Sequence, residues 1–383
     1  MNILHLVDAT FQDKPGGSRK YAQEVALCMV EAGHSITFLA PKSRPEQPKC
    51  EVWNGLKIHR YHGSNPAARQ LALRQSFLAL NSDYRFDAAV VHFAYTALAF
   101  HVTQQNTPTL RVFHGPWDME NAAEFGIKGI QRKVVLRIMH NIENFSLQRS
   151  DRIICLSEFM AQDVTERFLI PAEKVQIIPG GVNLKQFCPG NRAEARKKLG
   201  LSEDAFVVCT TRRLAKRMGI ELLIEAAATA RKDIPDLQIR IAGRGPLQKD
   251  LQDRIDNLQL QDCVKLLGFV PDEELKDHYC SADLFVLPTT SLEGFGLVIL
   301  EALACDTPVL GSPVGAIPDV LGKFDRELIL PGCSADAVSE GIVKFYRSPE
   351  RRARKYRSAI EASYSWQHVS EELLEQIAIL LRK

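Results

Sequence analysis

Short runs of β-branched and aliphatic residues alternate with longer amphipathic stretches along the whole chain, and this alternation limits the fold more than any other feature. Strands separated by helix-length segments indicate parallel sheets covered by helices. In the first half, strands are predicted at residues 3–7, 35–40, 57–61, 86–92, 109–114, 152–156 and 175–178, and helices at 18–32, 66–80, 127–149 and 158–168. In the second half, strands are predicted at 205–210, 237–242, 264–269, 283–287, 308–311 and 327–330, and helices at 220–230, 247–258, 297–304 and 335–345. The pattern predicts an α/β protein with two doubly wound domains.

The length of 383 residues agrees with two domains, since a chain of this size rarely builds a single core. Between the two series lies a turn rich in proline and glycine, at residues 187–192. Such a turn is typical of a hinge between domains. We therefore expect a first domain at residues 1–188 and a second at 189–363.

The composition argues against several classes of protein. A formal net charge of +2 argues against nucleic-acid binding, which favours a strong basic excess. The nine cysteines contain no C-x-x-C pair, which is typical of reduced thiols in an intracellular protein. The first residues lack the pattern of a signal peptide, and no apolar run reaches membrane-spanning length. We expect a soluble cytoplasmic protein.

Two motifs follow predicted strands of the first domain. Gly16 and Gly17 precede a helix, where backbone amides can approach an anion, although a simple turn has the same sequence. The motif is not G-x-G-x-x-G, which argues against a nicotinamide dinucleotide site. His114 follows the strand at 109–113, on the edge where ligands of open α/β sheets bind. Taken alone, it fits a structural histidine equally well.

Cations and glycines follow two strands of the second domain. Residues 211–219, Thr-Arg-Arg-Leu-Ala-Lys-Arg-Met-Gly, place four cations after the strand at 205–210, which favours binding of a diphosphate. Gly243 and Gly245 follow the strand at 237–242 and are predicted to shape a pocket for a nucleotide base.

The segment from Glu293 to Glu301, Glu-Gly-Phe-Gly-Leu-Val-Ile-Leu-Glu, carries the strongest functional signal. It joins a strand to a helix that opens at Gly296, so its amides and the helix N-terminus favour phosphate. Glu301 is a carboxylate within an apolar helical run and needs hydrogen-bond partners. Ribose hydroxyls suit it, because a carboxylate accepts two hydrogen bonds at once. Glu293 is expected near the sugar end of the same ligand.

This segment resembles the signature of the retaining glycosyltransferases of family 4, which have the GT-B fold. The resemblance continues in order through most of the chain, in Gly16-Gly17, His114-Gly115, Ser157-Glu-Phe, Ile178-Pro-Gly-Gly-Val-Asn, Arg213-Leu, Gly243-x-Gly-Pro, Gly268-Phe-Val and Tyr364-Ser-Trp. It implies two Rossmann-like domains that face a central cleft. The first would bind the acceptor and the second the donor, and a C-terminal helix at 364–383 would cross back to the first domain.

The resemblance also implies roles for single residues. Glu301 would hold the ribose, Arg213 would neutralise the diphosphate, and His114 would touch the donor sugar near the reacting carbon. Glu293 would contact the sugar, and Gly17 would bring amides to the phosphate. The implied catalytic residues are His114, Glu293, Arg213 and Arg217, and the implied donor-binding residues are Gly16, Gly17, Arg213, Lys216, Arg217, Gly243, Gly245, Phe269, Glu293, Gly294, Phe295, Gly296, Leu297 and Glu301.

One position departs from the family pattern. The family commonly has Arg-Leu-x-x-x-Lys-Gly, and this chain places Met218 at the position of the lysine. A thioether cannot neutralise phosphate. We expect Arg217 to supply the second cation, with Lys216 and Arg212 as alternatives.

The expected reaction moves a hexose or an N-acetylhexosamine from a nucleoside diphosphate sugar to an acceptor hydroxyl with retention of configuration. UDP is favoured as the nucleotide on family frequency, and no cofactor or obligatory metal is expected. The sequence leaves a glycan, a glycolipid and a small metabolite open as acceptors, and it assigns neither acceptor-binding residues nor an oligomeric state. A non-catalytic sugar-nucleotide sensor and a sugar-nucleotide epimerase of the same fold are the alternatives. A phosphorylase would need a lysine for pyridoxal phosphate, for which there is no clear candidate.

The segment at 127–149 mixes aliphatic residues with Arg132, Lys133 and Arg137. Packing in the core is the simpler interpretation of the aliphatic residues. The alternative is peripheral contact with the inner face of a membrane.

Overall fold

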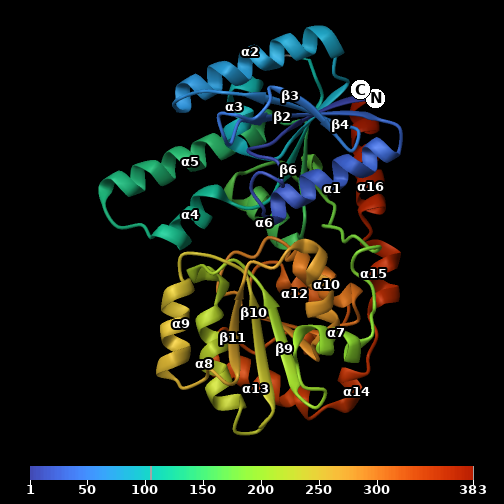
Figure 1. The fold of residues 1–383 in the computed structure, drawn as a ribbon. Coiled ribbons are helices and arrows are strands. Elements are labelled where there is room, and N and C mark those ends of the chain that lie inside the picture. Colours follow the sequence, from blue (N-terminus) through green and yellow to red (C-terminus); the bar gives the residue numbers. More distant parts are fainter. Residues whose placement is uncertain (104–105, 383) are drawn as a thin grey trace. The chain divides into compact units, whose positions relative to one another are not determined.

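The computed structural model describes residues 1–103 and 106–382, and the chain forms two compact units (Figure 1). The first unit comprises residues 1–122, 127–181 and 366–383, and the second comprises 123–126 and 182–365. The prediction of an α/β protein with two doubly wound domains is confirmed. Within the described ranges, none of the helices combines the length and the apolar character that crossing a membrane requires.

The first unit is built on an eight-stranded sheet of order β3-β4-β2-β1-β5-β6-β7-β8. The strands are β1 (Asn2–Leu6), β2 (Ser35–Pro41), β3 (Cys50–Trp53), β4 (Leu56–Tyr61), β5 (Ala88–Val91), β6 (Thr109–Phe113), β7 (Arg152–Cys155) and β8 (Val175–Ile177). All neighbours pair in parallel except β3 and β4. The central strands are buried on both faces, which explains their nearly continuous apolar sequence.

The helices of the first unit are α1 (Gly17–Glu31), α2 (Pro66–Tyr84), α3 (Ala94–Thr103), α4 (Trp117–Phe125, whose last residues belong to the second unit), α5 (Ile130–Arg149), α6 (Glu158–Arg167) and α16 (Trp366–Leu381), with a short 3₁₀ helix at Ala172–Lys174. The C-terminal helix α16 packs on α1, where the rings of Tyr21 and Trp366 meet edge to face with centroids 5.5 Å apart. The C-terminal helix therefore returns to the first unit, as predicted.

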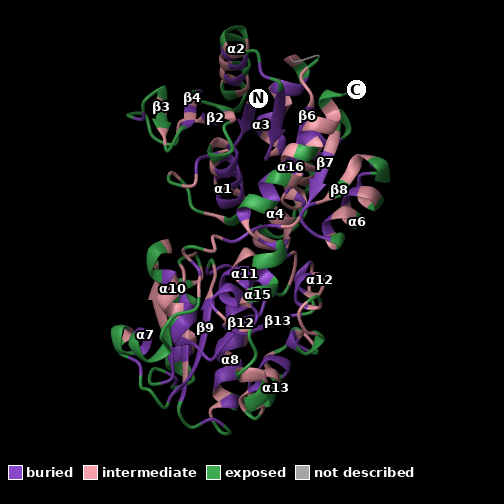
Figure 2. Cartoon of the chain, turned by 90° about the vertical axis from the view of Figure 1, so that its right-hand side faces the viewer, coloured by how far each residue is buried: buried purple, intermediate pink, exposed green. Residues whose placement is uncertain are grey.

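The second unit is built on a five-stranded parallel sheet of order β11-β10-β9-β12-β13. The strands are β9 (Phe206–Thr211), β10 (Leu237–Ala242), β11 (Val264–Gly268), β12 (Leu284–Leu287) and β13 (Val309–Gly311). The helices are α7 (Arg192–Leu199), α8 (Ile220–Ala230), α9 (Gln248–Asn257), α10 (Asp272–Ser281), α11 (Leu297–Ala304), α12 (Ile317–Leu321), α13 (Ala335–Tyr346), α14 (Pro349–Arg352) and α15 (Arg357–Ser363), with 3₁₀ helices at Lys216–Met218 and Arg326–Leu328. Figure 2 shows that β9, β12 and β13 are buried almost throughout.

One predicted strand is wrong. Residues 327–330 do not form a strand; a 3₁₀ helix at Arg326–Leu328 begins with the Asp325 side chain accepting from the Glu327 amide, and Ile329 alone bridges to Gly311. Strand β3 was not predicted; it pairs with β4 through a turn at Asn54 and Gly55, both with positive φ. An Asn-Gly pair between two apolar runs is a strong hairpin signal, and it was available in the sequence.

Candidate active site

Three loops meet at the carboxyl edge of the sheet in the second unit. The first, named here the cation loop, spans residues 212–219 after β9; the second spans 243–246 after β10; and the third spans 288–296 after β12. The strands are parallel neighbours, so the loops that follow them share one edge. All residues in these loops belong to the second unit.

Glycines let the backbones of these loops touch. A Cβ atom on Gly243, whose φ is +141°, would lie 1.7 Å from the carbonyl oxygen of Arg212. A Cβ on Gly245 would lie 2.2 Å from the carbonyl oxygen of Leu214. On the other side, a Cβ on Gly219 would lie 1.9 Å from the carbonyl oxygen of Pro288. The cation loop is therefore held between its two neighbours by backbone contacts that only glycine permits.

Glu293 lies in the third loop with its carboxylate buried. Arg212 Nη2 lies 2.5 Å from Glu293 Oε2, and the Thr289 hydroxyl donates to the same oxygen at 3.3 Å. The Ala316 amide donates to the Glu293 carbonyl at 2.9 Å. Glu293 is thus fixed by both its backbone and its side chain.

Arg217 is turned toward the third loop. Its Nη1 donates to the Leu292 carbonyl at 2.9 Å, and its own carbonyl accepts from the Thr290 amide at 2.9 Å. Leu292 has a φ of +56°, which is unusual for a residue with a branched side chain. Arg217 therefore braces the loop that carries Glu293. Lys216, the adjacent cation that was also predicted to bind the donor, is exposed.

Met218 points into the core instead. Its side chain is buried in the same apolar cluster as Leu214 and Ile220. The sulfur lies 2.7 Å from Arg212 Nη2. The position where the family places a lysine is thus occupied by an apolar side chain in contact with a guanidinium.

Arg213 has half of its side chain exposed. Its guanidinium forms two hydrogen bonds to the carboxylate of Glu124, at 2.6 and 3.1 Å, and Glu124 belongs to the segment 123–126 of the second unit. A carboxylate and a phosphate offer similar acceptors to a guanidinium, so the pairing shows that Arg213 is accessible to an anion.

Glu301 lies in the middle of α11 and is buried. The Tyr279 hydroxyl donates to Glu301 Oε2 at 2.7 Å. Burial first, and then the Glu301 carboxylate, raise the pKa of Tyr279 well above its usual range, so the phenol stays protonated and remains a donor. The N-cap of α11 is Gly296, whose φ is +81° and which has no side chain to accept from the amides of the first turn. Amides of that turn are therefore open to an anion.

The remaining predicted residues differ in position and in exposure. Phe295 is buried, whereas half of Phe269 is exposed and the Arg244 guanidinium lies 5.7 Å from its ring centroid. Gly294 lies in the third loop, and Leu297 is the first residue of α11.

The first unit carries a row of three stacked histidines on neighbouring strands. His5 in β1 shares a hydrogen bond with His92, which follows β5, with Nδ1 and Nε2 3.1 Å apart. His92 Nδ1 in turn lies 3.2 Å from Nε2 of His114, which follows β6. His114 was predicted from the sequence as a candidate site residue, whereas His5 and His92 were not. The three histidines lie at the ends of β1, β5 and β6, which are neighbours in the sheet. Knowledge of the strand order would therefore have identified them as a group.

Burial keeps these imidazoles neutral. It lowers the pKa of His5 to about 3, and it lowers the pKa of His114 to about 3 with help from Arg111 and Arg19. The pKa of His92 is also lowered, first by burial and then by its two histidine neighbours. A neutral imidazole can donate from one nitrogen and accept at the other.

Gly16 and Gly17 lie at the start of α1. Gly16 is the N-cap and Gly17 is the first helical residue, so the N-cap residue has no side chain to accept from the amides of the first turn. Two residues on, Arg19 pairs with Asp8, and its Nε lies 2.9 Å from Asp8 Oδ1. The guanidinium carbon of Arg19 also lies 5.6 Å from the ring centroid of Phe93.

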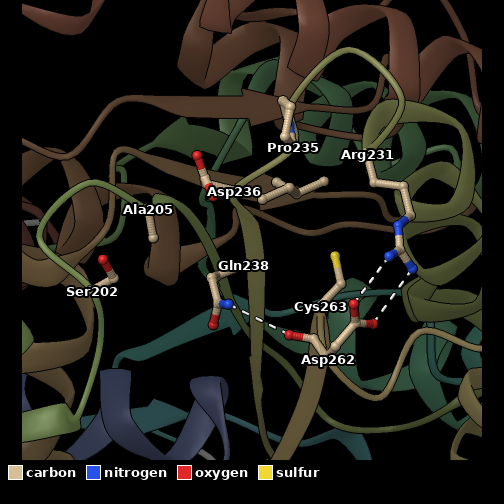
Figure 3. A pocket seen from close by; sticks show the side chains of 9 residues that line it. Ser202, Ala205, Arg231, Pro235, Asp236, Gln238, Asp262 and Cys263 are labelled. Carbon is tan, nitrogen blue, oxygen red and sulfur yellow. Dashed lines mark hydrogen bonds and ion pairs between the residues drawn. The ribbon is translucent and has the colours of Figure 1, made fainter.

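A hollow of about 160 Å³ in the second unit lies away from these loops (Figure 3). It is lined by residues at the amino ends of β9, β10 and β11, including Cys263 and the ion pair of Arg231 with Asp262. Ligands of parallel sheets bind at the opposite edge, so this hollow is separate from the candidate site. The described residues contain no group of three or more His, Cys, Asp or Glu side chains placed to hold a metal ion.

Comparisons with known proteins identify the family of the chain. Residues 15–186 match the family described as Glycosyltransferase Family 4, and residues 191–362 match the family described as Glycosyl transferases group 1. One curated relative is the phosphatidylinositol N-acetylglucosaminyltransferase GPI3 subunit of Saccharomyces cerevisiae, which is 23% identical over 98% of this chain and 82% of its own length.

Solved structures show the same fold. Sucrose-phosphate synthase from Thermosynechococcus elongatus aligns with a TM-score of 0.82 and 23% identity, over 100% of this chain and 99% of its own. The Anabaena protein Alr3699/HepE, solved in complex with UDP and glucose, aligns with a TM-score of 0.78 and 18% identity, over 99% of both chains. The chain belongs to the group 1 glycosyltransferases, family 4, with a GT-B fold, and is an enzyme that transfers a sugar from a nucleotide sugar.

Proposed function

We propose that this glycosyltransferase moves a hexose or an N-acetylhexosamine from a nucleoside diphosphate sugar to an acceptor hydroxyl, with retention of configuration. The observation that carries the proposal is the placement of two buried carboxylates, Glu293 and Glu301, on the loop and helix that adjoin the cation loop. Within one unit, anion-binding amides and cations suit the diphosphate of such a donor, and carboxylates suit the hydroxyls of its ribose and its sugar.

In this proposal the second domain, residues 189–363, binds the donor. Glu301 accepts hydrogen bonds from the ribose hydroxyls, and Tyr279 orients its carboxylate. Arg213 and the first amides of α11 bind the diphosphate, and Glu293 faces the sugar. Since the diphosphate is the leaving group, cations that bind it also stabilise charge that develops in the transition state. The leaving phosphate would assist deprotonation of the acceptor, so a pair of glycosidase-type carboxylates is not required.

The first domain, residues 1–188 with the C-terminal helix, binds the acceptor in this proposal. His114 contributes a neutral imidazole to the donor sugar, and the amides at Gly16 and Gly17 face a phosphate oxygen. His92 holds the ring of His114 by a hydrogen bond and by stacking, which reduces the entropy lost when a substrate binds. UDP is our choice of nucleotide.

A panel of donors tests the proposal. The enzyme is incubated with UDP-glucose, UDP-N-acetylglucosamine and GDP-mannose, each with lipid, glycan and small-molecule acceptors, and release of nucleoside diphosphate is measured. Release that depends on an acceptor, with loss of donor binding in Glu301→Ala, is the expected result. Tight donor binding without turnover for any pair would instead support the sensor alternative.

The acceptor is proposed to be carried by an anionic lipid surface. Ile130, Val134 and Ile138 follow one another at intervals of four residues on α5 and are 83%, 53% and 51% exposed. Packing in the core, the simpler interpretation from sequence, therefore does not account for these three side chains. Exposed Lys133 and Arg137 flank them. An exposed aliphatic face beside basic residues suits the boundary between headgroups and acyl chains, and the yeast relative is named for a phosphatidylinositol acceptor.

Flotation with vesicles of phosphatidylcholine and phosphatidylglycerol tests this surface. Ile130→Glu should reduce the floated fraction, and Val102→Glu is the matched control, because Val102 is 70% exposed on α3. Equal flotation of both variants and the wild type would remove the lipid proposal and would leave the transferase proposal intact.

A further inference from the structure

The family pattern supplies a second diphosphate-binding cation from a lysine that this chain lacks. Arg213 provides one cation, and the position at which the family places a lysine holds Met218. Its side chain is buried among apolar residues and carries no charge. If the donor is bound as proposed, a second cation has to reach the same place from another position.

The side chain of Arg212 reaches that place. Arg212 Nη2 lies 2.7 Å from Met218 Sδ, 3.2 Å from Thr289 Oγ1 and 2.5 Å from Glu293 Oε2. A lysine at position 218 would extend two bonds, about 2.5 Å, beyond the atom that corresponds to Sδ. The guanidinium nitrogen of Arg212 is therefore as far from Sδ as the ammonium of that lysine would be.

Arg212 also has a donor to spare. Only 9% of its side chain is exposed, and among the residues that the structure describes its buried Nε meets no hydrogen-bond partner. The three contacts above all use Nη2, whereas a guanidinium carries five N–H donors. An unpaired donor on a buried cation is costly, and an incoming phosphate oxygen would remove that cost.

Arg217, the residue that the sequence favours, is used differently. Its Nη1 donates to the carbonyl of Leu292, which holds the third loop in its left-handed turn. The hydrogen bonds of Arg212 Nη2, in contrast, go to the side chains of Met218, Thr289 and Glu293, and the Glu293 carboxylate is proposed to face the sugar.

The geometry points to Arg212 as the second diphosphate-binding cation, in place of the lysine that Met218 has replaced. Glu293 and Thr289 orient it, and the backbone contact between Arg212 and Gly243 fixes its position along the loop. This inference rests on the proposed function, and it adds a residue whose contact with the leaving group would lower the barrier to transfer.

Titration calorimetry measures the binding of UDP, GDP and ADP, and of the matching monophosphates, to the wild type, Arg212→Gln and Arg217→Gln. A charge-assisted hydrogen bond predicts that Arg212→Gln weakens diphosphate binding by about 10- to 100-fold. Monophosphate binding should change much less. Equal losses of diphosphate and monophosphate affinity in Arg212→Gln would show that Arg212 only supports the fold. A larger loss of diphosphate affinity in Arg217→Gln would assign the cation to Arg217. Either result overturns the inference.

A rescue variant distinguishes loss of the cation from misfolding of the Arg212→Gln protein. In Arg212→Gln with Met218→Lys, the lysine regains the position that the family uses, and diphosphate binding should return to within several-fold of the wild type. Circular dichroism and thermal melting confirm that the double variant is folded. A folded double variant that binds as weakly as the single variant refutes the substitution. If the wild type binds none of the three diphosphates, the proposed function itself fails and the inference falls with it.

Discussion

The row of histidines in the first unit makes the stability of that unit depend on pH. His5 is fully buried, and burial lowers its pKa to about 3 from the 6.5 of a free imidazole. Between these values the unfolded chain binds a proton that the folded chain does not. The stabilisation is therefore complete above pH 6.5 and is lost as the pH falls toward 3. Between pH 7 and pH 5 one such group costs about 2 kcal/mol of unfolding free energy.

The expected loss is larger when the neighbours are counted. The pKa of His114 is lowered to about 3, and that of His92 is lowered too, so all three act in the same direction. Arg111 and Arg19 face this row and add to the shift at His114. Buried Glu143 acts in the opposite direction, since burial raises its pKa and its folded form binds the proton more readily. A comparison of variants is needed to isolate one histidine.

Urea unfolding followed by tryptophan fluorescence provides the assay. The three tryptophans, Trp53, Trp117 and Trp366, all lie in the first unit, so their emission reports on that unit alone. His5→Phe keeps an aromatic ring beside Phe38, and its unfolding free energy should fall about 2 kcal/mol less than that of the wild type between pH 7 and pH 5.

Exposed His62 supplies the control variant, His62→Gln, whose pH profile should run parallel to that of the wild type. If His5→Phe also runs parallel to the wild type, burial does not hold His5 neutral, and the argument for a neutral histidine row is refuted.

Three further predictions concern single contacts. Tyr279→Phe removes the hydrogen bond to buried Glu301, so we expect a loss of about 1–2 kcal/mol in unfolding free energy and weaker binding of nucleoside diphosphate in calorimetry; an unchanged affinity would separate Tyr279 from donor binding. Gly243→Ala places a Cβ against the Arg212 carbonyl at a positive φ, so we expect about 1–3 kcal/mol of strain and faster hydrogen exchange in residues 212–219; unchanged exchange would show that the loops are not coupled. Arg111 and Glu143 form a buried ion pair at 2.7 Å, so Arg111→Met should cost about 3–5 kcal/mol by fluorescence-detected unfolding. Arg111→Met with Glu143→Leu should recover part of that cost, and no recovery would contradict the ion-pair explanation.

Most of the fold was predictable because its central strands are buried on both faces. The strand at Leu237–Ala242 and the helices at Ile220–Ala230 and Leu297–Ala304 have the predicted bounds, since apolar residues mark them and polar residues or glycine end them. Elements at the surface were harder to predict. Half of the β3 residues are exposed, and α4 buries none of its residues, so neither has the periodic apolar face by which a sequence reveals an element. At residues 327–330, apolar side chains are packed by tertiary contacts without forming a strand ladder.

The positions of the candidate site residues were predictable for glycines and carboxylates, whose places are set by the backbone, but not for the head groups of long cationic side chains. Glu301 and Gly243 lie where the pattern of strands and helices predicts, because helix geometry and backbone contact determine their positions. A guanidinium at the end of a flexible side chain can reach either of two neighbouring loops, and the sequence does not say which. Arg217 and Arg212 are five positions apart in one loop, yet one donates to a backbone carbonyl and the other pairs with Glu293. Assigning a cation to a phosphate therefore requires the contacts of its head group, and those contacts are the basis on which we propose Arg212.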